Sequence, residues 1–182
     1  MVQKKHCMSS VFIAALGLVL IAGAALAQDV TTYVYPDQNN PQFLVDFPND
    51  WTVETSTDGG VTTIVGKKAE AGIVLLTLPA KKVENLTPEA WDAIVDMPLE
   101  NAFSDLEYLD EPEEGTSNDI EFWKQNATGT DKETGKPVEL IVSIYFPNDV
   151  TTVLVYTVCE EASSDQYRDE QLAILDTIRL PE

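Results

Sequence analysis

The sequence has 182 residues, with 11 basic and 31 acidic side chains and a formal net charge of −20. A chain this acidic repels phosphate backbones and anionic headgroups, which argues against nucleic acids and charged membrane surfaces as partners. The apolar content of 44% is too high for a disordered chain, and the length suits a single domain with a core of its own.

The first 27 residues have the pattern of a secretory signal peptide. Lys4 and Lys5 precede an uncharged apolar stretch, Val11 to Ala25, and small residues stand at Ala25 and Ala27, where a signal peptidase cleaves. The stretch is shorter than the roughly 20 residues of a spanning helix, so we favour cleavage over retention as an anchor. We therefore expect an exported chain, in the periplasm or outside the cell, with no integral membrane segment after cleavage.

Cleavage changes the chemistry that remains available. Lys4 and Lys5 are removed while all 31 acids stay, so the formal charge falls from −20 to −22. His6 and Cys7 also leave, and the remaining chain has one cysteine, Cys159, and no histidine. This excludes Ser-His-Asp and Cys-His catalysis and the usual catalytic zinc sets. We expect Cys159 to be a buried, inert thiol at the end of a strand, beside Glu160 and Glu161, which raise its pKa.

After a leader over residues 28–42, the remainder, 43–182, is predicted to form one domain rich in strands. Alternating or continuous apolar runs bounded by turn residues predict a mainly antiparallel sheet of about six strands. The later runs are apolar on both parities, which indicates that both faces of the sheet are covered, and helices are the expected cover. The runs are 43–47, the one opening at 51–54, 61–65, 73–78, 120–130, 138–146 and 150–158.

Two helical regions are expected to supply that cover. Thr87-Pro88-Glu89 has the residues of a helix start, and an apolar stripe from Trp91 to Leu106 includes Phe103 and is interrupted at Pro98, which is best placed at the start of a second piece. The last helix is predicted from Ser163 or Ser164, with Gln166 completing a capping box, to a point before Pro181. The fold class is therefore α+β, with helices on both faces of the sheet.

The stretch from Asp105 to Glu121 contains eight acids together with Pro112 and Gly115, and we expect it to be mostly loop. Carboxylates are the ligands that calcium prefers, so a cation site in this loop is an alternative to simple solvated charge. The weak candidate ligands are Asp105, Asp110, Glu111, Glu113 and Glu114.

The residues from Phe43 to Phe47, followed by Pro48 and Trp51, resemble the opening pattern of the PsbP/Mog1 family. The segment Ile174 to Leu180 resembles the closing helix of that family, and the likeness covers roughly Val34 to Leu180. The resemblance implies an α/β/α sandwich. Similar domains occur as an extrinsic subunit of the photosystem oxygen-evolving complex, as a partner of a nuclear small GTPase, and as secreted bacterial proteins of unassigned role.

The resemblance carries over no catalytic residues and implies no cofactor. The sequence therefore favours an exported, non-enzymatic binding or accessory domain whose partner is another envelope or extracellular protein. A hydrolase of extracellular glycans that uses paired carboxylates stays open as an alternative. Trp51, Trp91 and Trp123 are expected in the core; an exposed one beside Tyr33 or Tyr35 would instead anchor a partner.

Overall fold

The computed structural model describes residues 29–182 apart from 37, 40, 79–86, 88, 90–91 and 150. The predicted signal peptide lies outside the described residues. Within them, no helix is both long enough and apolar enough to cross a membrane.

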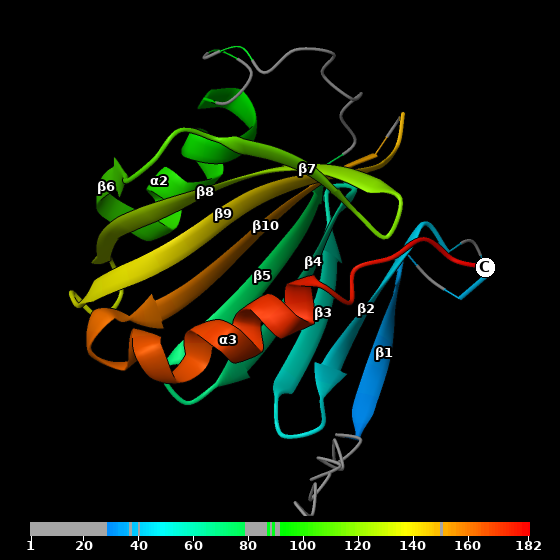
Figure 1. Cartoon of the computed structure of the whole chain (residues 1–182), viewed down its shortest axis with the longest axis horizontal. Coiled ribbons are helices and arrows are strands. Elements are labelled where there is room, and N and C mark those ends of the chain that lie inside the picture. Colours follow the sequence, from blue (N-terminus) through cyan, green and yellow to red (C-terminus); the bar gives the residue numbers. More distant parts are fainter. Residues whose placement is uncertain are drawn as a thin grey trace, which may run out of the picture.

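One large antiparallel sheet forms the centre of the molecule (Figure 1). It has eight strands in the order β3-β4-β5-β10-β9-β8-β6, with β7 pairing alongside β8 as well. The prediction of about six strands was too low, because β6 forms where we expected the end of a helix and the start of a loop, and β7 forms within the acidic stretch that we expected to be loop. The strands are β3 (Thr52–Asp58), β4 (Val61–Lys68), β5 (Ala71–Leu78), β6 (Phe103–Tyr108), β7 (Glu113–Ser117), β8 (Ile120–Asp131), β9 (Pro137–Asn148) and β10 (Thr151–Glu160).

The sheet has two apolar faces, as the sequence predicted. Side chains of neighbouring residues in a strand point to opposite faces, so in β10 Val153 and Val155 belong to one core while Leu154 belongs to the other. The first face is covered by α3 (Ser164–Leu175) and by a separate two-stranded sheet of β1 (Val30–Tyr35) and β2 (Phe43–Pro48). The second is covered by Val95 and Leu99, from a π-helical turn, η1 (Asp92–Asp96), and a short helix, α2 (Met97–Ala102).

Helical cover on both faces is therefore matched only in part. The first face is shared between a helix and a hairpin whose first strand lies inside the expected leader. The helix on the second face is short, and the start predicted at residues 87–91 falls mostly outside the described residues. Pro98 stands in the first turn of α2, as predicted. Phe103 and Leu106 were expected in this helix but belong to β6, because Phe103 pairs with Asp131 of β8.

The last helix lies within its predicted bounds, since α3 begins at Ser164 and ends before Pro181. A short 3-10 turn, η2 (Glu161–Ser163), precedes α3. Ser163 is the N-cap but makes no side-chain cap hydrogen bond, so the capping box with Gln166 does not form. The helix ends at Leu175; beyond it the Thr177 hydroxyl donates to the Ile174 carbonyl oxygen, 2.7 Å away, and Arg179 bridges to Leu44 of β2.

Predictions about single side chains in the core hold where the structure describes them. Trp51 and Trp123 are buried, at 5% and 9% exposure, and Trp91 lies outside the described residues. Cys159 is a free, buried cysteine at the end of β10. Burial, with a smaller contribution from Glu139, Glu70 and Glu160, raises the pKa of its thiol to about 11. The expectation of an inert thiol is thus met by desolvation more than by neighbouring charge.

Candidate functional site: a groove beside the C-terminal segment

The chain that follows α3 runs along the outer edge of β2 and ties the small sheet to the rest of the molecule. Leu44 and Arg179 form an isolated antiparallel bridge. The Leu44 amide donates to the Arg179 carbonyl over 2.9 Å, and the Arg179 amide donates to the Leu44 carbonyl over 3.1 Å. Ile178, at 2% exposure, anchors the segment in the core. The segment is thereby held beside β2 by a single β-bridge.

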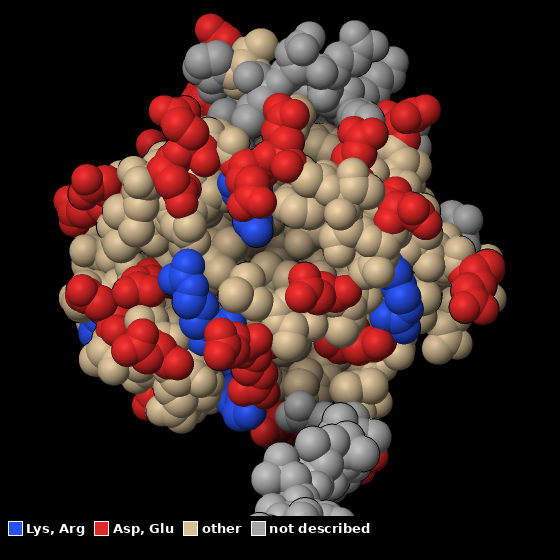
Figure 2. Space-filling view, in the orientation of Figure 1, with Lys and Arg blue, Asp and Glu red and all other residues tan. Residues whose placement is uncertain are grey.

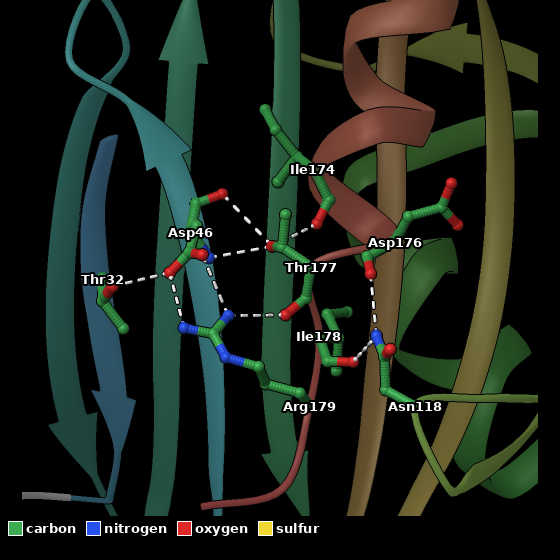
Figure 3. Close-up of polar contacts among 8 residues, drawn as sticks. All are labelled: Thr32, Asp46, Asn118, Ile174, Asp176, Thr177, Ile178 and Arg179. Atoms are coloured by element: carbon green, nitrogen blue, oxygen red, sulfur yellow. Dashed lines mark hydrogen bonds and ion pairs between the residues drawn. The ribbon is translucent and has the colours of Figure 1, made fainter. Parts of the chain in front are cut away.

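An ion pair between Asp46 and Arg179 fixes this contact (Figure 3). The two guanidinium nitrogens of Arg179 lie 2.9 and 3.1 Å from the two carboxylate oxygens of Asp46. Thr32 Oγ1 also donates to Asp46 Oδ1 at 2.6 Å, and the Asp46 amide donates to Thr177 Oγ1 at 2.9 Å. A bidentate pair of this kind combines charge with a fixed orientation. It therefore sets the angle at which the C-terminal segment leaves β2.

Asn118 holds the same segment from its other side. It lies in the turn between β7 and β8, and its side-chain amide donates to the carbonyl oxygens of Asp176 and Ile178, at 2.8 and 2.9 Å (Figure 3). Asn118 and Asp119 both have positive φ, 50° and 63°, a conformation that asparagine and aspartate tolerate better than most residues. The turn thus places the side-chain amide of Asn118 next to the carbonyl groups of the residues that follow α3.

Between these three parts lies an open groove of about 840 Å³. Its apolar lining comes from the outward face of the β1–β2 hairpin, where Val34 pairs with Leu44, and from Leu180 and Pro181. Polar lining is added by Asn118, Asp119, Arg179 and Glu182. By comparison, a hollow beside β3 measures about 170 Å³.

The electrostatics of the groove favour a neutral or cationic occupant. Among the described residues of its lining, Arg179 is the one cation, and its guanidinium is already paired with Asp46. Asp119 and Glu182 bring negative charge to the rim. Most of the visible face is uncharged, and among its charged side chains the acidic ones are more frequent than the basic ones (Figure 2). An anionic ligand would find no unpaired cation among the lining residues that the structure describes.

The five candidate cation ligands do not converge. All are exposed, and no group of three or more His, Cys, Asp or Glu side chains in the described part of the chain could hold a metal ion. The Asp110 carboxylate accepts from the Asn126 backbone amide at 3.0 Å and from its side-chain amide at 2.6 Å. Glu113 pairs with Lys124 at 3.2 Å. Asp105 has a positive φ within β6. Glu114 lies in β7, and Glu111 lies two residues before that strand.

Sequence reasoning missed the residues that build the groove. Asp46 was counted only as the polar member of an alternating strand, and Arg179 only as part of a closing helix. One signal was available, since Arg179 is one of only two arginines in the chain. The aromatic pair Tyr33 and Tyr35 packs inward, with ring centroids 5.7 Å from Phe47 and 5.0 Å from Phe43. Trp51 and Trp123 are buried, so neither is the exposed tryptophan that we considered as a partner anchor.

No family model matches the sequence, and no curated protein matches it either. The fold, however, is similar to that of solved structures. Cyanobacterial PsbP (CyanoP) from Synechocystis aligns with a TM-score of 0.61 at 11% identity, over 91% of this chain and all of its own. The Ran-binding protein Mog1p from Saccharomyces cerevisiae aligns with a TM-score of 0.52 at 12% identity, over 85% of this chain and 96% of its own.

A third similar structure is LpqN from Mycobacterium tuberculosis, described as involved in cell envelope biogenesis. It aligns with a TM-score of 0.51 at 13% identity, over 84% of this chain and 91% of its own. At such identities the likeness concerns the fold. The chain has a PsbP/Mog1-like fold, built on a mostly antiparallel sheet with few helices, as the pattern from Phe43 to Trp51 indicated.

Proposed function

We propose that this protein is an exported, non-enzymatic binding domain that holds a segment of another protein in the groove beside Arg179. The observation that carries the proposal is the groove itself, an apolar strip with an acidic rim and a guanidinium already neutralised by Asp46. Such a surface suits an apolar segment with basic flanks, because the strip is desolvated on contact and the rim attracts positive charge.

The comparisons support a binding role without naming a partner. Mog1p, which has the same kind of fold, is described as a Ran-binding protein, and LpqN as involved in cell envelope biogenesis. Export rests on the pattern of residues 1–27, with its lysines, its apolar stretch and its small residues at 25 and 27. We therefore place the partner in the cell envelope or outside the cell.

The groove can be tested with matched charge variants. Leu180→Asp places a carboxylate on the apolar strip, and Met97→Asp places one at a 57% exposed residue of α2, on the other face of the sheet. Immobilised wild-type protein and the Met97→Asp variant should retain the same protein from an envelope extract, and Leu180→Asp should lose it. Cross-links from that protein should then map to residues of the groove.

The outcomes that contradict the proposal are specific. Equal retention by all three proteins would place the contact outside the groove, and no retention above a blank matrix would remove the support for a binding role. Export has its own measurement, since a reporter enzyme active only outside the cytoplasm should gain activity when fused after residue 27 and stay inactive when residues 1–27 are deleted.

A further inference from the structure

The edge strand β3 is open to another strand along its outer side. It pairs with β4 through all seven of its residues, and it is the terminal strand in the order of the large sheet. Six of the seven residues are exposed. Among the described residues, none hydrogen-bonds to its outer backbone edge. A strand in this position presents unpaired N–H and C=O groups, which are a template for pairing with another chain.

Two observations decide which backbone groups point outward. Asp58 and Val61 close a two-residue turn in which Gly59 and Gly60 have φ of 58° and 86°, and the residues flanking such a turn bond to each other. The Thr62 amide instead points toward β5, where it donates to Thr77 Oγ1 at 3.0 Å. Bonding alternates along an antiparallel pair, so Thr57, opposite Thr62, points away from β4. The outward groups are those of Val53, Thr55 and Thr57.

The sequence of β3 lacks most of the features that block strand addition, and its only charges are Glu54 and Asp58. The strand Thr-Val-Glu-Thr-Ser-Thr-Asp contains no lysine and no proline, and its register with β4 is unbroken. At the opposite end of the sheet, the pairing of β6 with β8 is interrupted between Ser104 and Glu107, and Asp105 has a φ of 54°. A break of that kind bends an edge away from further pairing. The two edges are therefore built differently.

A hollow of about 170 Å³ lies against the open edge. Thr55 and Thr57 of β3 and Ile64 of β4 line one part of it, and Val34 and Pro36 at the end of β1 line another. Side chains of an added strand that lie opposite Thr55 and Thr57 share the face of those two residues. The hollow can take small, branched apolar side chains at those two positions.

The charge on the other face of β3 defines the remaining positions. Glu54 and Asp58 are exposed and lie on the same face, four residues apart. Cross-strand neighbours of opposite charge stabilise a pair of strands, and like charges destabilise it. A second copy of this chain, with a net charge of −20, would meet charge repulsion at this edge. A segment with two basic residues four apart would complement it.

We propose that β3 binds an extended segment of another protein by antiparallel strand addition, and that this segment carries two basic residues four apart with small apolar residues between them. Backbone bonds to Val53, Thr55 and Thr57 supply the affinity, and Glu54, Asp58 and the hollow supply the selectivity. This surface shares Val34 with the lining of the groove but includes no residue of the C-terminal segment, so it does not depend on the function proposed above.

A synthetic peptide tests the proposal directly. The peptide Thr-Lys-Val-Thr-Val-Lys-Thr places its lysines opposite Asp58 and Glu54 and its valines opposite Thr57 and Thr55. Binding measured by NMR titration should be saturable and should slow amide hydrogen exchange at Val53, Thr55 and Thr57. Replacing both lysines with glutamate should weaken binding about tenfold at low salt, and the difference should shrink as salt is added.

Methylation of the peptide backbone provides the matched control. N-methyl groups on the two valines remove the amides that face β3, whereas an N-methyl group on the central threonine removes one that faces solvent. The first peptide should lose binding and the second should keep it, and Leu180→Asp should leave both results unchanged.

Four outcomes would overturn the proposal. They are absence of saturable binding, equal binding of the two methylated peptides, slow exchange at the three amides before any peptide is added, and a dimer in sedimentation that forms through β3. The last outcome would make a second copy of the chain the occupant of this edge.

Discussion

The two faces of the large sheet are covered in different ways. On the α3 face the cover comes from both ends of the described chain, and side-chain bonds between distant residues fasten it. Gln171 of α3 donates to the carbonyls of Gly72 and Val158, and Glu170 accepts from Trp51 Nε1 at 2.9 Å and from Lys68 Nζ at 2.8 Å. On the α2 face the cover, η1 and α2, leads directly into β6.

The two covers differ in how far apart in the sequence their hydrogen-bonded residues lie. The cover of the α2 face is held near the sheet by its own chain, because α2 ends at Ala102 and β6 begins at the next residue. Val95 and Leu99 pack against that face, the Tyr108 hydroxyl donates to the Asp96 carboxylate, and the Lys132 ammonium group donates to the Glu100 carbonyl. The hairpin and α3 lie far apart in sequence, and fixing them costs more loop-closure entropy. Hydrogen bonds and ion pairs add orientation that apolar packing alone does not supply.

The largest expected change in the free energy of unfolding comes from truncating one large apolar side chain in each cover. Phe47 is 1% exposed, packs beside Trp51 and lies over Gly66, where an added Cβ would come within 2.3 Å of its ring. Phe47→Ala should lower the free energy of unfolding by roughly 3–5 kcal/mol, and Leu99→Ala by about 2–3 kcal/mol because a short cover can relax onto the cavity. Chemical denaturation measures both.

A larger loss for Leu99→Ala than for Phe47→Ala would break the comparison, since it would make the short helix the more important cover. An exposed substitution on each element, Asn49→Ala after β2 and Asn101→Ala in α2, serves as the control. Each should change stability by less than about 0.5 kcal/mol.

The hydrogen bonds of Gln171 beneath α3 give the next largest expected change in stability. Gln171 is 3% exposed, and its amide nitrogen lies 3.0 and 2.9 Å from the carbonyl oxygens of Gly72 and Val158. Gln171→Ala removes both bonds and should destabilise the fold by about 1–3 kcal/mol. Gln166→Ala, on the exposed side of the same helix, should be nearly neutral. Similar denaturation midpoints for the two variants would show that packing alone holds α3.

How far the sequence predicted these two faces depends on the range of the interactions. The apolar runs of β5, β9 and β10 are local signals, and they indicated a sheet covered on both sides. β6 and β7 were missed because their acids resemble a solvated loop, and only pairing with β8 makes them strands. Asp46 and Arg179 are 133 residues apart, so no local pattern joins them. Gln171 is polar within a helix, and only its contacts with Gly72 and Val158 distinguish it from a surface residue.

The single thiol reports how tightly the α3 face is closed. Because burial raises the pKa of Cys159 to about 11, a thiol reagent should react with it at pH 8 only after opening or unfolding. The matched probe is Ala127→Cys in a Cys159→Ala background, since Ala127 is 1% exposed on the α2 face. In protein lacking residues 1–27, labelling should be slower at Cys159. Faster labelling at Cys159 would mean that the α3 face opens more readily than the α2 face.

The same thiol has a pH consequence. The pKa of Cys159 rises from 9.0 to about 11 on folding, so the unfolded chain loses this proton first as pH increases. The contribution to stability is complete below pH 9 and disappears as pH rises toward 11. Cys159→Ala should therefore reduce the fall in unfolding free energy over that interval. An unchanged slope would show that the thiol does not contribute to it.

The smallest expected effects on stability concern two buried hydroxyl groups on the α3 face, only one of which has a hydrogen-bond partner among the described residues. Ser143 lies in β9 at 1% exposure, and its hydroxyl has no hydrogen-bond partner among the described residues. Thr77 is equally buried, but its hydroxyl donates to the Thr62 carbonyl at 2.8 Å and accepts from the Thr62 amide. Burying an unpaired hydroxyl is unfavourable, so Ser143→Ala should raise the free energy of unfolding by up to about 1 kcal/mol, whereas Thr77→Val should lower it by about as much. Differential scanning calorimetry would detect both shifts, and a destabilised Ser143→Ala would mean that this hydroxyl has a partner and that the polar fastening of the α3 face extends to the centre of the sheet.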